Sequence, residues 1–226
     1  MQLNHPVGVS TSVEAMVRSD VQLMLEVKAG DEASFALLLH RYRTPVVNFL
    51  NRLVRNQATA EDLAQEVFLR VYRSREKYAP SAKFTTWLFR IATNLALNSI
   101  RDYRHHLLDV SIDVAPDEEE GRTFELRARE KNIDQQMLES DRAAAIRRAV
   151  DALPEKQRVA VLLHKYEEMD YTQISKVLDC TESALKSLLF RAYETLRVQL
   201  APFAGLAAAP TSAGAPPMSE LGKGRA

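Results

Sequence analysis

Histidine and cysteine are among the side chains in this sequence that could bind a metal ion, and cysteine could also act as a nucleophile. His105 and His106 are followed by Asp109, but adjacent histidines on a helix face different directions and do not easily share one ion. The remaining histidines have no partner at the spacing of metal ligands, and the single cysteine, Cys180, is more typical of a small buried side chain. No glycine-rich phosphate loop or nucleophile motif is present. The sequence therefore predicts neither an enzyme nor a metal or other cofactor.

Side chains suited to duplex DNA lie near the C-terminus. Residues 171–199 have the layout of a helix-turn-helix, in which Thr172 and Thr181 are the expected N-caps. One face of the second helix is apolar and must pack on a core. The opposite face carries hydroxyls, cations and one aromatic ring, from Ser183, Lys186, Ser187, Phe190 and Arg191. Such a face fits the major groove, where cations meet guanine and apolar groups meet thymine methyls. A helical hairpin with a merely solvated face is the alternative.

Aromatic residues alternate with cations over residues 78–106. Rings that stack on bases, next to cations that follow phosphates, are typical of surfaces that bind single-stranded DNA. Asn94 and Asn98 are four residues apart on one face of the expected helix, and amides can read the edge of a flipped base. Phe84 and Trp87 are predicted to be core residues, because large aromatics supply much of the burial in a small domain.

The expected helix over residues 60–72 has an outer face that amphipathicity alone does not explain. Acidic residues in its first turn complement the helix dipole. Gln65, Glu66 and Leu69 also lie on the outer arc, where an exposed leucine surrounded by polar groups can anchor a partner. The pattern alone fits either a plain solvated face or a docking surface, and both interpretations stay open.

The elements that must position these residues are helices. Apolar residues recur at three- and four-residue spacing over residues 20–106 and 138–200, which predicts an all-α protein with two small helical domains. Gly30 is expected to end the first helix, and Pro45 to interrupt or restart the second. The rest of the chain is an N-terminal extension at 1–19, an acidic flexible linker at 107–137 and a disordered Ala/Pro-rich tail at 201–226.

Charge is distributed unevenly along a chain whose net charge is zero. Residues 20–106 hold 13 lysines and arginines against nine acidic residues, a balance of +4. Residues 107–142 hold five against 11, and residues 143–200 hold nine against eight. A mildly basic domain followed by an acidic segment is compatible with nucleic-acid binding that is weak in the free protein.

The compartment is predicted to be the cytoplasm. A single cysteine excludes an internal disulfide framework and fits a reducing environment. The N-terminus lacks the pattern of a secretion signal, and no stretch approaches the roughly 20 apolar residues that span a bilayer, so membrane insertion is not expected.

Three motifs follow one another along the chain. Residues 59–68 (TAEDLAQEVF) resemble the polymerase-binding helix of sigma region two, and residues 84–94 (FTTWLFRIATN) resemble its promoter-melting segment. Sigma region four is resembled by residues 153–158 (LPEKQR), 171–175 (YTQIS) and 186–192 (KSLLFRA). Together they resemble the extracytoplasmic-function, or group IV, sigma factors of bacterial RNA polymerase.

This resemblance implies a non-enzymatic subunit that binds polymerase core, selects promoters and promotes strand opening, with region two at 20–106 and region four at 138–200. The residues implied to bind the clamp of the largest polymerase subunit are Asp62, Gln65, Glu66 and Leu69. The residues implied to contact the minus-ten element are Tyr78, Lys83, Arg90, Ile91, Asn94, Asn98 and Arg101. Those implied to contact the minus-thirty-five element are Ser183, Lys186, Ser187, Phe190 and Arg191.

Two departures from the family pattern stand out. Leu188 and Tyr193 occupy positions where many members have arginine, so phosphate anchoring upstream is expected to be weaker or placed elsewhere. The tail after residue 200 extends past the usual end of the family. An anti-sigma partner is common in the family, although no residue identifies one here. The alternative function is an autonomous helix-turn-helix regulator that binds duplex DNA without polymerase and leaves the surface around Gln65 unused.

Overall fold

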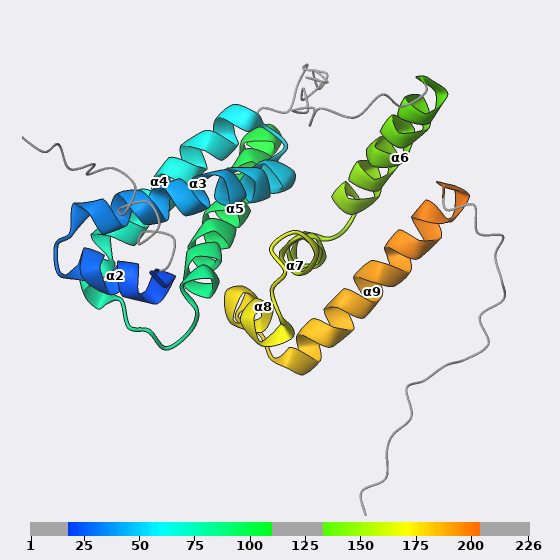
Figure 1. Ribbon diagram of the computed structural model, residues 1–226. Coiled ribbons are helices and arrows are strands. Elements are labelled where there is room, and N and C mark those ends of the chain that lie inside the picture. Colours follow the sequence, from blue (N-terminus) through cyan, green and yellow to red (C-terminus); the bar gives the residue numbers. More distant parts are fainter. Residues whose placement is uncertain (1–17, 110–132, 204–226) are drawn as a thin grey trace, which may run out of the picture.

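The computed structural model describes residues 18–109 and 133–203, with side chains described outside 107–138. Within these ranges the chain is helical and has no β-strand, which confirms the all-α prediction. The N-terminal bundle consists of α2 (Asp20–Lys28), α3 (Glu32–Val54), α4 (Gln57–Arg73), the short 3₁₀ helix η1 (Arg75–Lys77) and α5 (Phe84–Asp109). The C-terminal bundle consists of α6 (Ile133–Asp151), α7 (Glu155–Lys165), α8 (Tyr171–Leu178), α9 (Glu182–Leu200) and the 3₁₀ helix η2 (Ala201–Phe203). Figure 1 shows the two bundles side by side.

Capping residues define where several helices begin. Asp31 and Thr181 accept backbone N–H bonds at the starts of α3 and α9, and Thr181 is the cap that the sequence predicted for α9. The prediction for Thr172 was wrong. Asp170 caps α8 instead, and its capping box with Gln173 satisfies two backbone donors, so the helix begins before Thr172. Gly30 follows the end of α2 with a φ of 99°, a left-handed conformation that favours glycine.

Helix α3 runs through Pro45 without a break, so the predicted interruption does not occur. A proline inside a helix removes one hydrogen bond and costs about 3 kcal/mol or more. The apolar stripe of α3 continues on both sides of the proline, with Leu38 before it and Val46, Phe49 and Leu50 after it fully buried. This burial offsets the local cost and keeps the helix continuous.

Aromatic pairs fill the core of the N-terminal bundle. The rings of Phe49 on α3 and Phe89 on α5 meet edge to face with centroids 5.1 Å apart. Tyr42 and Phe84 form a second α3–α5 pair at 5.4 Å. Phe84 is buried as predicted, whereas Trp87 is only half-buried. The indole of Trp87 therefore reaches the surface of α5.

The C-terminal bundle is built around α7, whose residues from Arg158 to Leu163 are all buried. The stripe on α9 predicted to face a core does so, since Leu185, Leu189, Ala192 and Leu196 are buried. The opposite face of α9 is exposed. Helices α8 and α9 thus form a helix-turn-helix whose second helix has one face free.

The two bundles contact each other, which the sequence pattern did not predict. Helix α8 packs on α5, and α7 lies next to α3. Across this contact Gln173 Nε2 donates to Thr86 Oγ1 at 3.4 Å, and the guanidinium of Arg52 lies over the ring of Tyr166 at 4.1 Å. The buried apolar side chains of the two bundles form one continuous cluster. In this structure the bundles are one packed unit.

Glu167, in the connection between α7 and α8, should make stability depend on pH. Burial raises its pKa to about 7, against the opposing effect of Arg52. Because the folded pKa lies above the unfolded one, the folded state loses stability as pH rises from about 4.5 to about 7, and the penalty remains at higher pH. Glu167→Gln should therefore stabilise the protein at pH 8 by about 1 kcal/mol, a figure reduced for solvent screening, and have little effect at pH 4.5.

Urea unfolding of the parent and the variant at both pH values measures this difference. Glu168→Gln changes an exposed neighbouring carboxyl and is the matched control. A stabilisation by Glu167→Gln that is the same at pH 4.5 and pH 8 would contradict the role of ionisation.

Candidate polymerase and nucleic-acid interfaces

The outer face of α4 carries the four residues predicted to dock on polymerase. Asp62, Gln65, Glu66 and Leu69 are spaced so that they share one side of the helix. Leu69 is 48% exposed, which is high for a leucine and confirms its outward position. Glu66 accepts a hydrogen bond from Arg70 Nε at 2.7 Å, and this contact lowers the pKa of its carboxyl. The face offers carboxylate, amide and apolar groups at helical spacing.

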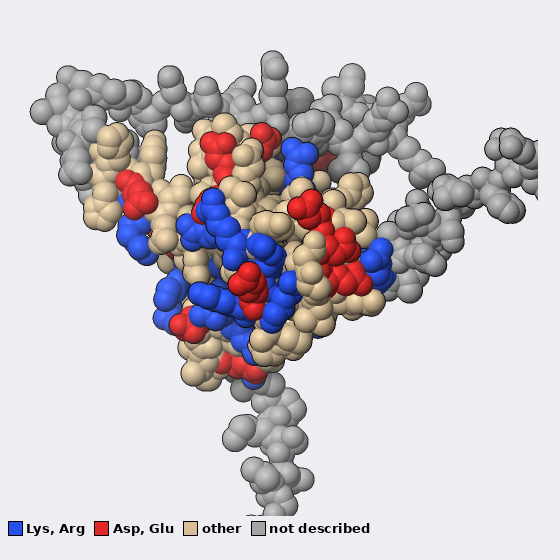
Figure 2. All heavy atoms as spheres, turned by 90° about the vertical axis from the view of Figure 1, so that its left-hand side faces the viewer, with Lys and Arg blue, Asp and Glu red and all other residues tan. Residues whose placement is uncertain are grey.

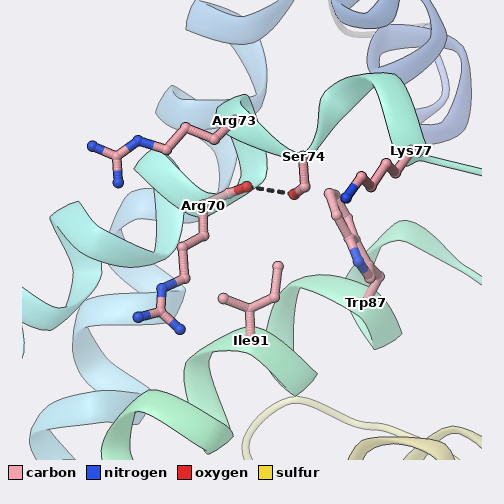
Figure 3. A pocket seen from close by; sticks show the side chains of 6 residues that line it. All are labelled: Arg70, Arg73, Ser74, Lys77, Trp87 and Ile91. Carbon is pink, nitrogen blue, oxygen red and sulfur yellow. Dashed lines mark hydrogen bonds between the residues drawn. The ribbon is translucent and has the colours of Figure 1, made fainter.

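An open pocket of about 400 Å³ lies between the C-terminal half of α4 and the N-terminal half of α5. Its lining residues are Arg70, Arg73, Ser74, Lys77, Trp87 and Ile91. In Figure 3 the side chains of Trp87 and Ile91 rise from α5 toward the α4 end, where the Ser74 hydroxyl donates to the Arg70 carbonyl. One wall is therefore apolar and aromatic, and the rim carries three cations.

This combination of groups suits an unpaired nucleotide. An indole offers a stacking surface for a base, and cations at the rim can contact the flanking phosphates. Figure 2 shows lysine and arginine side chains gathered on the face of the protein seen from the left of Figure 1, with carboxylates among them. Base stacking and phosphate contact are therefore available at one place.

The structure places the predicted minus-ten residues in different surroundings. Ile91 lines the pocket, and Asn94 and Asn98 follow it on the same face of α5 with exposed side chains. Tyr78 is 4% exposed, its ring packs on Trp87 at 5.2 Å, and Lys28 Nζ donates to its carbonyl oxygen. Tyr78 thus lies behind the indole and supports it, and its ring is not on the surface.

The three cations among the predicted minus-ten residues, Lys83, Arg90 and Arg101, are all exposed. Lys83 precedes α5, and Arg101 lies in its second half, where it donates to Asn98 Oδ1 at 3.4 Å. Arg90 points toward the C-terminal bundle, with its Nη2 3.8 Å from Asp179 Oδ1. The structure therefore brings Arg101 to the asparagine face but places Arg90 at the bundle interface.

Sequence reasoning missed the cations of the pocket rim, Arg70, Arg73 and Lys77. They belong to a dense basic segment, with four lysines or arginines within residues 70–77. That density at the end of a helix was the available signal.

The five residues predicted to contact the minus-thirty-five element all lie on the exposed face of α9. Phe190 is 67% exposed, an unusual position for a phenylalanine unless it binds a partner. At the two positions that depart from the family pattern, Leu188 is half-buried, and the Tyr193 hydroxyl lies 2.7 Å from His164 Nδ1. Tyr193 therefore contributes to packing inside the bundle.

Two absences hold for the described part of the chain. No group of three potential ligands that could hold a metal ion occurs there, and His105 and His106 are simply exposed. None of the described helices is long and apolar enough to cross a bilayer.

Comparison with known proteins agrees with this geometry. The family model for sigma-70 region 2 matches residues 38–106, and the model for sigma-70 region 4 matches residues 143–196. The RNA polymerase sigma-H factor of Pseudomonas aeruginosa is 32% identical over 188 residues, which cover 81% of this chain and 94% of that protein. The ECF RNA polymerase sigma-E factor of Escherichia coli K12 is 30% identical over 186 residues, covering 81% and 95%.

Solved structures share the fold. CnrH, solved with the cytosolic domain of CnrY, has a TM-score of 0.58 at 20% identity and covers 82% of this chain and 99% of CnrH. The sigma factor RpoE of Bartonella quintana, solved with the anti-sigma factor NepR, has a TM-score of 0.57 at 20% identity, covering 74% and 96%. The fold and the exposed surfaces define this protein as a two-region helical protein with a helix-turn-helix. The chain belongs to the sigma-70 family of RNA polymerase sigma factors, in its extracytoplasmic-function group.

Proposed function

We propose that this sigma factor docks on polymerase core through the outer face of α4, holds an unpaired minus-ten base at the pocket between α4 and α5, and inserts α9 into the major groove of the minus-thirty-five element. The observation that carries the proposal is the pocket itself. It joins an accessible indole, Trp87, to a cationic rim and lies next to the exposed amide of Asn94.

Strand opening by such a site requires no catalytic step. Unpairing and unstacking one base costs a few kcal/mol, and a protein that binds only the flipped base offsets that cost and shifts the equilibrium toward open DNA. The sigma factor would then act purely by differential binding, without turnover of its own. We also expect an anti-sigma factor, common in the family, as a further partner.

Asn94→Ala tests the base pocket. The variant holoenzyme should bind duplex promoter nearly as well as the parent but form open complexes about tenfold less, because the amide would contact the base only after it is flipped. Permanganate reactivity of unpaired thymines measures opening, and a mobility shift at low temperature measures duplex binding. Asn48→Ala, an exposed asparagine on α3, is the control. Equal losses in both assays would argue against a base pocket at Asn94.

The double variant Gln65→Ala/Glu66→Ala tests the docking face. Because Gln65 is exposed and Glu66 is only partly buried on the outer arc of α4, the fold should persist while affinity for core polymerase falls about tenfold, as expected when interface anchors are truncated. Titration of labelled sigma factor with core enzyme measures the affinity, and circular dichroism checks helicity. Glu32→Ala, an exposed acid on α3, should bind core normally. Unchanged affinity of the double variant would remove the assignment of this face.

Transcription in vitro with core polymerase and a promoter library tests the proposal as a whole. A transcript that depends on the sigma factor and starts at a defined position is the expected result. If the free protein bound promoters with an affinity that core polymerase does not change, the autonomous regulator would be the better description.

A further inference from the structure

The indole in the wall of the pocket between α4 and α5 is supported by two other rings. Trp87 is half-buried, and its ring packs on that of Tyr78 with centroids 5.2 Å apart and on that of Phe84 at 6.1 Å. Phe84 lies on α5, the same helix as Trp87, whereas Tyr78 lies in the connection between η1 and α5. The position of the indole therefore depends on where this connection holds Tyr78.

Helix α2 holds Tyr78 by its main chain. Lys28 Nζ donates a hydrogen bond to the carbonyl oxygen of Tyr78 at 3.0 Å, between residues that are 50 positions apart in the sequence. Lys28 lies in the last turn of α2, which is anchored in the core by the buried side chains of Leu23, Met24 and Val27. Because α2 is anchored, this bond ties the start of the connection to the core of the bundle.

Tyr78 contributes to the pocket by the packing of its ring. Its side chain is buried, and the hydroxyl oxygen is buried with no hydrogen-bond partner among the described residues. A buried hydroxyl without a partner is destabilising, so the hydroxyl does not explain why the ring lies there. The contact that holds the residue is the bond from Lys28 to its carbonyl, and the surface that the ring supports is the indole.

We propose that Lys28 is a positioning residue for base binding at the pocket. By holding the Tyr78 carbonyl it keeps the Tyr78 ring against Trp87, and so keeps the indole in the orientation that stacks on an unpaired base. This inference rests on the proposed function. Stacking depends on ring orientation, and a binding group keeps its orientation only when its supporting residues are themselves held by packing and hydrogen bonds.

A second interpretation of Lys28 makes a different prediction. A cation in the last turn of a helix complements the helix dipole, and this effect stabilises α2 whatever happens at the pocket. Loss of that effect would lower the free energy of unfolding and leave the indole as it is. Loss of a positioning residue changes the surroundings of Trp87 directly.

The test uses the fluorescence of the full chain, because Trp87 is the only tryptophan in the sequence. Lys28→Met removes the ammonium group and should raise the quenching of the indole by acrylamide about twofold, because a less firmly held indole is open to solvent more often. Its affinity for oligothymidylate, measured at low salt by quenching of the same indole, should fall about threefold, as expected for the loss of one hydrogen bond. Lys28→Arg keeps a cationic donor and should restore both values.

Two further variants separate positioning from charge and from a direct effect on the indole. Arg43→Met removes one positive charge from an exposed position on α3 and should leave acrylamide quenching unchanged. Tyr78→Leu removes the supporting ring and should raise quenching as Lys28→Met does. If Lys28 acts through Tyr78, adding Lys28→Met to Tyr78→Leu should raise quenching little further, because changes to two residues that act as one unit are not additive.

Three results would overturn the assignment. The first is a Lys28→Met variant that matches Arg43→Met in quenching and in affinity. The second is a Lys28→Met variant that unfolds at lower urea concentration but has the quenching of the parent, which is the result expected from the helix dipole. The third is a full effect of Lys28→Met in the Tyr78→Leu background.

The acrylamide measurement contains no DNA, so it separates this inference from the proposed function. If the parent failed to bind oligothymidylate while Lys28→Met still raised acrylamide quenching, the base pocket would be wrong and the support of Trp87 by Lys28 would stand. If the parent bound oligothymidylate and Lys28→Met bound it equally well, the base pocket would stand and Lys28 would not be a positioning residue.

Discussion

Phe49→Ala is expected to lower the free energy of unfolding by about 3–5 kcal/mol. The ring of Phe49 is fully buried and meets Phe89 edge to face in the centre of the N-terminal bundle. Its removal takes away apolar burial, breaks the aromatic pair and leaves a cavity that neighbouring side chains fill only in part. Because most single domains have a total stability of only 5–15 kcal/mol, the variant should be close to unfolding at physiological temperature.

Urea denaturation followed by circular dichroism measures this loss. Phe190→Ala is the matched control, since it removes the same side chain from an exposed position on α9 and should change stability by no more than about 0.5 kcal/mol. Similar losses in the two variants would mean that Phe190 is buried in solution or that Phe49 is not.

Helices and buried stripes could be predicted from the sequence because both depend on local periodicity. The stripe Leu185–Leu189–Ala192–Leu196 on α9 is buried as the pattern requires. The exposure of Leu69 on α4 and of Phe190 on α9 also followed from position on a helix. In each case the residues that decide the outcome lie within a few turns of one another.

Features that depend on residues far apart in the chain escaped this reasoning. Whether Tyr78 lies on the surface depends on where Trp87 packs, and the pocket rim needs the end of α4 beside the start of α5. Periodicity says that both helices have an apolar face but not how they are aligned. Contact between the bundles depends on single pairs such as Arg55 with Asp151, which are 96 residues apart.

Local rules also gave way where tertiary packing outweighed them. A proline at position 45 predicts a break, yet the apolar stripe of α3 is buried before and after it. The helix remains continuous because burial on both sides exceeds the cost of one lost hydrogen bond. The sequence pattern takes account of the cost of the proline, but it does not show the burial of α3 against α4 and α5.

Arg191→Ala should weaken binding of the holoenzyme to its promoter by about 1–3 kcal/mol, or roughly 5- to 150-fold, if the guanidinium pairs with a base edge. Arg191 lies on the exposed face of α9, and its Nε donates to the carbonyl of Ser187 at 3.2 Å. That bond fixes the side chain along the helix and leaves the two terminal nitrogens to reach a guanine. If Arg191 makes such a contact, Arg191→Ala should lower affinity only for promoters that have the matching base pair.

Competition binding on promoters with each upstream base pair changed in turn separates the two ways in which an arginine can act. If Arg191 reads a base, the variant should lose the parent's preference for one base pair at a single promoter position. Changes at the other positions should alter the affinities of the variant and the parent by similar factors. If Arg191 contacts a phosphate, the loss of affinity should be uniform across promoter sequences. The slope of log affinity against log salt concentration should then fall by about one. Arg197→Ala lies further along α9, where Arg197 pairs with Glu194 at 3.0 Å, and should leave binding nearly unchanged. If Arg191→Ala bound promoters as well as Arg197→Ala, Arg191 would not contact the promoter. The proposed orientation of α9 in the major groove would then be wrong.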